Sequence, residues 1–126
     1  LVVFDVDNFK QVNDRYGHVK GDICLAEIAA CIKRAYARHG YCYRTGGDEF
    51  CVLLRDGDKE HACARDFVRR LSERRKELDF LPTVSFGSAE ISNDNVVTVK
   101  DRADHNMYRY KKERKAHRMS GDAGEE

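Results

Sequence analysis

The chain has 126 residues, a length that suits one domain with a single hydrophobic core. Apolar residues make up 41% of it and charged residues 36%, a balance typical of globular proteins rather than disordered ones. The formal net charge is only +1, so we expect neither a nucleic-acid partner nor general attraction to an anionic membrane. No apolar run is long enough to cross a bilayer and no signal peptide is evident, which favours a cytoplasmic domain.

The first residues, "LVVFDVD", are already typical of a strand and lack a methionine, so we expect a segment of a longer protein, which could be membrane-tethered. Residues 1–6 predict a buried strand, and the alternation of side chains along a strand places Asp5 and Asp7 on one face. Residues 8–18 are polar and include Gly17, which indicates a short helix or a loop.

Residues 21–39 predict an amphipathic helix, with Asp22 at its start and Gly40 closing it. Its apolar face comprises Leu25, Ile28, Ala29, Ile32 and Tyr36. A hairpin follows, in which "YCYRT" and "FCVLL" flank a Gly46-Gly47 turn. If these two glycines are the turn residues, Cys42 faces Cys51 across the hairpin.

Three further elements complete the chain: a helix over 59–78, a strand over 83–91 introduced by Pro82, and a helix over 99–115. The side chains expected to face the core from these helices are Phe67, Val68, Leu71, Ala103, Met107 and Tyr110. Residues 119–126 are small and acidic and predict a disordered tail. The order of elements predicts one α/β sandwich, with helices packed against a mixed or antiparallel sheet.

The five cysteines form no closely spaced pairs, which disfavours a structural metal site. We expect reduced and mostly buried thiols, as in cytosolic proteins. His18 has no partner at metal-ligand spacing and is expected to be a hydrogen-bonding loop residue.

Paired carboxylates are the main candidates for chemistry. Asp5 ends the first strand and Asp48 follows the hairpin turn, so the two converge if their strands are neighbours. Such a pair suits a two-metal phosphoryl-transfer site. Gly46 and Gly47 would let a nucleotide approach the backbone closely. The alternative is that Asp48 and Glu49 simply follow an ordinary surface turn, where acids are common.

Three polar residues could complete a nucleotide site. Lys10 lies close to Asp5 in the sequence and could neutralise phosphate charge. Asn13 and Asp22 supply an amide and a carboxylate, which together could recognise the Watson–Crick edge of a purine. Each of these residues alone also has an ordinary explanation, as an exposed lysine or a helix-capping acid.

The motifs "DVDNFKQVNDRYGHVKGD" and "RTGGDEF" resemble the GGDEF family, the diguanylate cyclases that make cyclic di-GMP. The resemblance continues through "TVSFGSAEI" and "RADHNMYRYKK" and covers residues 1–118, as a domain truncated at its N-terminal side. It implies a ferredoxin-like palm, as in class III nucleotide cyclases: an α+β sandwich whose central, mainly antiparallel sheet is flanked by helices.

The resemblance also implies roles for the acidic residues and the first lysine. Asp5 and Asp48 would bind two Mg²⁺ or Mn²⁺ ions per active site, assisted by the backbone carbonyl of Val6. Lys10 would stabilise charge on the phosphates in the transition state, and Glu49 would lie near the metal and the 3′-hydroxyl.

Substrate contacts follow in the same way. Asn13 and Asp22 would hydrogen-bond guanine and select GTP over ATP. Lys111 would hold the terminal phosphates, and Lys115 stands where the family has a phosphate-binding arginine, within "RKA" in place of Gly-Arg-Asn. The family's product-inhibition motif, Arg-x-x-Asp, is matched by Ala37 and Gly40, so no such inhibition is expected; Arg38 is one position off.

The reaction implied is attack of one GTP's 3′-hydroxyl on the α-phosphate of another, with each subunit of a catalytic homodimer bringing one GTP. A sensory or regulatory domain is expected elsewhere in the full-length protein. Two alternatives remain: a catalytically silent module that binds GTP or a protein partner, and a palm enzyme that cyclises a single nucleotide.

Overall fold

The computed structural model describes residues 1–92 and 95–117, with side chains up to residue 114. The strands are β1 (Val2–Val6), β2 (Gly40–Arg44), β3 (Glu49–Leu54) and β4 (Val84–Ser88). The helices are α1 (Phe9–Tyr16), α2 (His18–Tyr36), α3 (Glu60–Glu77) and α4 (Val96–His117), with a short 3₁₀ turn, η1 (Gly57–Lys59), before α3. The tail expected over residues 119–126 lies outside the described residues.

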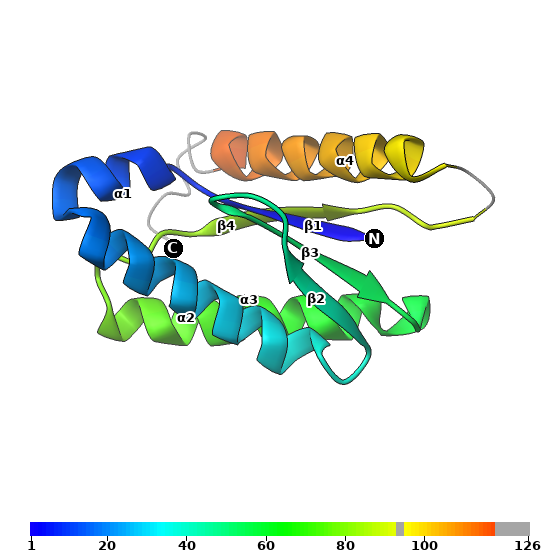
Figure 1. Ribbon diagram of the computed structural model, residues 1–126, viewed down its shortest axis with the longest axis horizontal. Helices are drawn as coiled ribbons and strands as arrows, with labels where there is room; N and C mark the ends of the chain where they lie inside the picture. Colours follow the sequence, from blue (N-terminus) through cyan, green and yellow to red (C-terminus); the bar gives the residue numbers. More distant parts are fainter. Residues whose placement is uncertain (93–94, 118–126) are drawn as a thin grey trace.

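The strands form one antiparallel sheet in the order β2-β3-β1-β4, with β1 between β3 and β4. Helices α2 and α3 cover one face of this sheet and α4 covers the other, as Figure 1 shows. The prediction of an α+β sandwich with a central antiparallel sheet is therefore confirmed.

Alternation along β1 divides the core between the two faces. Phe4 points toward α2 and α3, and its ring lies 5.4 Å from that of Tyr36 and 5.2 Å from that of Phe67, both in edge-to-face geometry. Val3 points the other way and packs with Cys51 and Ala103 beneath α4. One strand thus anchors helices on both faces of the sheet.

Helix α4 passes very close to β4 at Gly87. A Cβ atom at this position would lie 2.1 Å from the backbone nitrogen of Met107 and 2.7 Å from the carbonyl oxygen of Ala103. Only a glycine permits this approach, which brings the inner face of α4 down onto β4 and β1. The predicted inward positions Ala103 and Met107 are confirmed by this packing.

Helix α2 begins three residues earlier than predicted. Gly17, with φ of +91°, turns the chain between α1 and α2, and α2 starts at His18. Asp22 therefore lies inside the helix and does not begin it. The predicted role of Gly40 as helix terminator is also wrong: α2 ends at Tyr36, and Gly40 begins β2.

The hairpin register differs from the two-residue turn that the sequence predicts. Residues between β2 and β3 form a four-residue connection, and Cys42 lies opposite Val52 while Tyr43 lies opposite Cys51. The extra loop residues shift the pairing by one position, so Cys42 and Cys51 point to opposite faces of the sheet. The expectation that these two cysteines face each other across the hairpin is therefore wrong.

Burial agrees with the remaining core predictions except at one position. Val68 has 46% of its surface exposed, whereas Phe67 and Leu71 on the same helix are buried. The five cysteines are free thiols, four of them buried and Cys42 half-buried. No helix in the described part of the chain combines the length and the apolarity needed to span a membrane.

The close approach at Gly87 predicts a specific loss of stability. Gly87→Ala should lower the free energy of unfolding by about 2 to 3 kcal/mol, because α4 must move away from β4 to admit the methyl group. Urea denaturation followed by circular dichroism measures this change. Gly57→Ala is the matched control, since a Cβ there meets no atom within 4 Å. Equal stability of the two variants would contradict the packing described.

Candidate active site

The pairing of β1 with β3 brings the predicted acidic residues to one end of the sheet. Asp5 lies opposite Glu49, and the Val6 amide donates to the Asp48 carbonyl oxygen at 3.1 Å. In an antiparallel ladder the amide and carbonyl of one residue face the same neighbouring strand. The Val6 carbonyl is therefore directed toward the start of β3, where Asp48 lies.

The carboxylate of Asp5 is in an unfavourable electrostatic environment. Burial raises its pKa above the ordinary value of 3.8, and the negative charges of Asp48, Asp7 and Glu49 raise it further. Lys111 on α4 acts in the opposite direction and lowers it. An ionised Asp5 beside Asp48 is a pair of hard oxygen ligands whose repulsion a divalent cation would relieve, so these residues fit Mg²⁺ or Mn²⁺.

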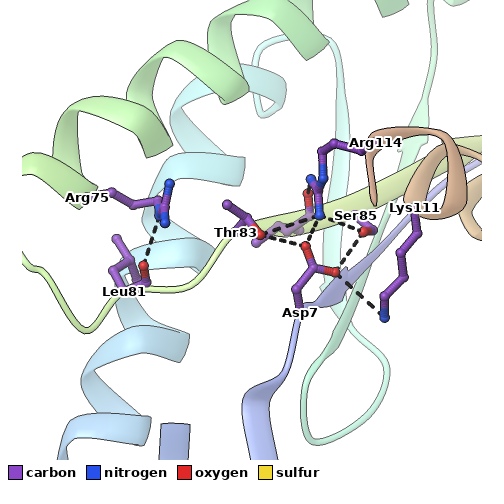
Figure 2. Close-up of polar contacts among 8 residues, drawn as sticks. Asp7, Arg75, Leu81, Thr83, Ser85, Lys111 and Arg114 are labelled. Carbon is purple, nitrogen blue, oxygen red and sulfur yellow. Dashed lines mark hydrogen bonds and ion pairs between the residues drawn. The ribbon is translucent and has the colours of Figure 1, made fainter. Parts of the chain in front are cut away.

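Asp7, the second acid of "DVD", is occupied differently. It is only 5% exposed, and it accepts hydrogen bonds from Thr83 Oγ1 and Ser85 Oγ, both at 2.7 Å. Arg114 also donates to its carboxylate, as Figure 2 shows. With both oxygens engaged, Asp7 organises the site and is not available as a metal ligand.

Helix α4 supplies the positive charge of this region. The Lys111 Nζ atom lies 3.7 Å from an Asp7 oxygen, and Arg114 binds the other oxygen (Figure 2). Arg114 also donates a hydrogen bond to the Val84 carbonyl oxygen at 3.1 Å. The Arg114 guanidinium also lies over the Tyr110 ring, 5.2 Å from its centre. Lys115 belongs to the same helix, but its side chain lies outside the described residues.

The residues Asp7 and Arg114 were missed as a pair by sequence reasoning. The only signal for Arg114 is its spacing of three residues from Lys111, which places both side chains on one helical face. Its partner is 107 residues away in the sequence, so nothing local could identify it.

The hairpin tip is held by its own backbone and by Arg44. Arg44 donates from Nε to the Gly46 carbonyl at 3.1 Å and from Nη2 to the Gly47 carbonyl at 2.6 Å. Neither glycine has a positive φ, a Cβ on Gly47 would meet no atom within 4 Å, and one on Gly46 would make only an ordinary contact. The fold of the chain therefore does not itself require glycine at these two exposed positions.

Asn13 and Asp22 lie at the corner between α1 and α2. A Cβ on Gly21 would lie 1.9 Å from Asn13 Oδ1, so the Asn13 side chain rests directly on the α2 backbone. Asp22 is the next residue along α2 and is exposed, and Lys10 is exposed one turn before Asn13 on α1. The structure thus places an amide and a carboxylate close together in an open position.

Glu49 does not join the other acids around a common point. Among the described residues, no group of three or more His, Cys, Asp or Glu side chains is arranged to hold one metal ion. The Glu49 carboxylate instead accepts from Thr45 Oγ1 at 3.0 Å and lies 3.7 Å from Lys100 Nζ on α4. The donors present for a cation are the Asp5 and Asp48 carboxylates and the Val6 carbonyl.

The raised pKa of Asp5 predicts a gain in stability when its charge is removed. The folded protein holds the Asp5 proton more tightly than the unfolded chain does, so the ionised group destabilises the fold. This penalty is absent below the ordinary pKa of 3.8 and develops as pH rises through the raised value. In EDTA, Asp5→Asn should therefore be more stable than wild type at pH 7, by less than about 1 kcal/mol because the group is partly exposed.

Urea denaturation of Asp5→Asn at pH 7 and at pH 3 measures this effect, and the gain should disappear at the lower pH. Asp14→Asn, at an exposed aspartate on α1, is the control for a change of net charge. An Asp5→Asn variant that is less stable than wild type at pH 7 would contradict the electrostatic environment described.

Comparison with known proteins agrees with this geometry. The family model for the diguanylate cyclase GGDEF domain matches residues 1–117. Diguanylate cyclase DgcN of Escherichia coli (strain K12) is 33% identical over 126 residues, which are 90% of this chain and 30% of that protein. Probable diguanylate cyclase DgcJ of the same strain is 30% identical over 86% of this chain and 22% of its own length.

A solved structure shows the same fold. The GGDEF domain of DgcB from Caulobacter crescentus, in complex with c-di-GMP, superimposes with a TM-score of 0.76 at 30% identity, covering 88% of this chain and 70% of that one. The chain spans between about a fifth and a third of the length of the two curated relatives. The match over residues 1–117 establishes that the chain belongs to the GGDEF domain family.

Proposed function

We propose that the chain is the catalytic domain of a diguanylate cyclase, which condenses two GTP molecules into cyclic di-GMP. Each of two 3′-hydroxyl oxygens would attack the α-phosphorus of the other GTP, forming two phosphodiester bonds and releasing two pyrophosphates. The observation that carries this proposal is the juxtaposition of Asp5, on β1, with Asp48, which directly precedes the paired strand β3, near the Lys111 cation of α4. The curated relatives named above, both called diguanylate cyclases, support it.

Asp5 and Asp48, with the Val6 carbonyl, would hold the two Mg²⁺ or Mn²⁺ ions. When bound, these ions would polarise the reacting phosphate and lower the pKa of the attacking hydroxyl. Magnesium sites of nucleotide enzymes use one or two carboxylates and leave the remaining positions to substrate phosphates and water. Two carboxylates and one carbonyl at the end of β1 and the start of β3 match that requirement.

The phosphate groups of GTP would lie between the lysine side chains of this region and the backbone amides at the start of helix α1. Helix α1 begins at Phe9, two residues after Asp7, and the first amides of a helix have no partner within it. Lys10 in its first turn and Lys111 on α4 would add charge on either side, with Lys115 as a further candidate. Because the Asp7–Arg114 pair fixes the end of α4 to β4, Lys111 is held facing the acidic residues.

Guanine would be recognised by Asn13 and Asp22. Its Watson–Crick edge presents two neighbouring donors, N1–H and the amino group, which a carboxylate accepts together, while the asparagine amide can serve the remaining polar atoms. Adenine lacks the N1–H donor, so this pair would select GTP over ATP. The bare surface of Gly46 and Gly47 would leave room for the nucleotide to lie against the hairpin.

Two GTP molecules and one site per domain imply a homodimer during turnover, with two active sites facing each other. We further propose that the domain acts in the cytoplasm under the control of a sensory or regulatory domain in the full-length protein. The bacterial relatives are proteins of considerably greater length than this chain, which is consistent with such an arrangement.

Product analysis tests the proposed activity. Incubation of the chain at high concentration with GTP and Mg²⁺ should yield cyclic di-GMP and pyrophosphate, detected by chromatography and mass spectrometry. Asp48→Ala should lower the rate by about a hundredfold or more, because a charge-bearing ligand at the reacting phosphate is lost. The same assay is repeated on a longer form of the protein that includes more residues on the N-terminal side, so that the result does not depend on the length of the chain tested. GTP binding without product in both forms would support a silent regulatory module instead.

The two glycines of the hairpin give an independent prediction. Gly47→Ala should leave the free energy of unfolding unchanged within about 0.5 kcal/mol, because nothing in the fold opposes a methyl group there. Its turnover should nevertheless fall at least about tenfold, since the methyl group would intrude where substrate lies against the backbone. Urea denaturation and steady-state kinetics, compared with Gly57→Ala, separate these effects. Unchanged turnover would exclude close approach of substrate at Gly47.

A further inference from the structure

Helices α1 and α2 meet at a corner that is built on glycine (Figure 1). Gly17 lies between the two helices with a positive φ of +91°. Its amide donates to the Asn13 carbonyl oxygen at 2.9 Å, and its own carbonyl oxygen accepts from the Gly21 amide at 3.1 Å. These two hydrogen bonds join the last turn of α1 to the first turn of α2, where Asn13 lies against Gly21.

The Asn13 side chain is held at this corner by packing. It is half-buried, and no residue in the described part of the chain forms a hydrogen bond with its amide group. A Cβ atom on Gly21 would lie 1.9 Å from Asn13 Oδ1 and 3.1 Å from Asn13 Cγ, with Nδ2 farther away. The amide therefore rests on the bare backbone of Gly21, and its polar atoms remain available to a ligand.

The fold itself does not require glycine at position 21. Gly21 lies within α2 and has no positive φ, and alanine is more favourable than glycine inside a helix. The two atoms nearest to an added methyl group belong to the Asn13 side chain, which can rotate away. The third, Phe9 Cζ, lies at an ordinary contact distance of 3.4 Å. What glycine provides at this position is therefore the seat of the Asn13 amide.

We propose that Gly21 is a positioning residue that sets base specificity, because its bare backbone seats the Asn13 amide beside the Asp22 carboxylate. This inference rests on the proposed function, in which Asn13 and Asp22 hydrogen-bond guanine. A methyl group at position 21 would turn the Asn13 side chain away and would leave Asp22, the next residue along α2, in place. The base would lose its contact with the amide, while the contacts of the phosphates would remain.

This role predicts a loss of base selectivity in Gly21→Ala. The variant should bind 3′-deoxy-GTP about tenfold more weakly than wild type, as expected for the loss of one hydrogen bond to the base. Its affinity for 3′-deoxy-ATP should change by less than about twofold, because adenine presents different donors and acceptors to the same residues. Both nucleotides lack the attacking 3′-hydroxyl, so titration calorimetry in Mg²⁺ measures binding without turnover.

A double-mutant cycle tests whether Gly21 acts through Asn13. Asn13→Ala alone should weaken 3′-deoxy-GTP binding about tenfold, and the addition of Gly21→Ala should change the affinity further by less than about twofold. In urea denaturation, the midpoint of Gly21→Ala should be no lower than that of wild type, because alanine favours the helix. Gly57→Ala adds the same methyl group where no atom lies within 4 Å, and it should bind both nucleotides as wild type does.

The outcomes separate this inference from the proposed function. Unchanged 3′-deoxy-GTP binding, equal weakening for both nucleotides, or an undiminished effect in the Asn13→Ala background would overturn the role of Gly21 even if wild type makes cyclic di-GMP. A lowered urea midpoint would also overturn it, since glycine would then serve the fold. A selective loss that depends on Asn13, at undiminished stability, would uphold it even if no product is formed. Wild-type protein that does not prefer 3′-deoxy-GTP would overturn both this inference and the proposed guanine site.

Discussion

Asp5 lies beside Glu49 and Asp48 because β1 and β3 pair in one antiparallel register, and the candidate site depends on that pairing. A slip of one residue would turn every side chain of β1 to the opposite face and would bury Asp5 against α2 and α3. The register is fixed by the core, since Phe4 must meet Tyr36 and Phe67 on one face while Val3 meets Ala103 on the other. Core packing therefore determines where the acidic residues lie.

Helix α4 completes the site from the opposite layer. Its close contact with Gly87 brings its inner face near the sheet, and three cations along that face meet three acids. Lys100 meets Glu49, Lys111 stands beside Asp5 and Asp7, and Arg114 meets Asp7. These cations serve two purposes: Lys111 is the one that we propose to face the substrate phosphates, whereas Lys100 pairs with Glu49 and Arg114 holds Asp7 in place. Asp7 is engaged by Arg114, and Asp5 and Asp48 are the residues that we propose as metal ligands.

Most of the fold could be predicted from sequence patterns because those patterns are local. Strand β1, the hairpin and the three long helices follow from periodicity, and the hairpin motif identified the acidic residues. The hairpin register could not be derived because Thr45 and Asp48 join the two glycines in the connection, which a two-residue turn does not allow for. The start of α2 was misplaced because Gly17 alone makes the turn, through its positive φ, and the helix resumes immediately.

The positioning contacts of the site were beyond sequence reasoning for a different reason. Asp7 meets Arg114, and Glu49 meets Lys100, only because α4 folds back across the sheet. Each is an ordinary charged residue on an otherwise ordinary helix or strand, and nothing in its neighbourhood along the chain marks its partner. The candidate ligands could therefore be named from motifs, but the groups that orient them required the tertiary structure.

The most direct test of this account is anomalous diffraction at the manganese edge, from crystals of the chain grown with Mn²⁺ and a non-hydrolysable GTP analogue. We expect manganese peaks bound by carboxylate oxygens of Asp5 and Asp48, with the triphosphate completing the coordination and Asp7 still bound to Arg114. Manganese bound through Asp7, or nucleotide held with no metal at Asp5 and Asp48, would contradict it.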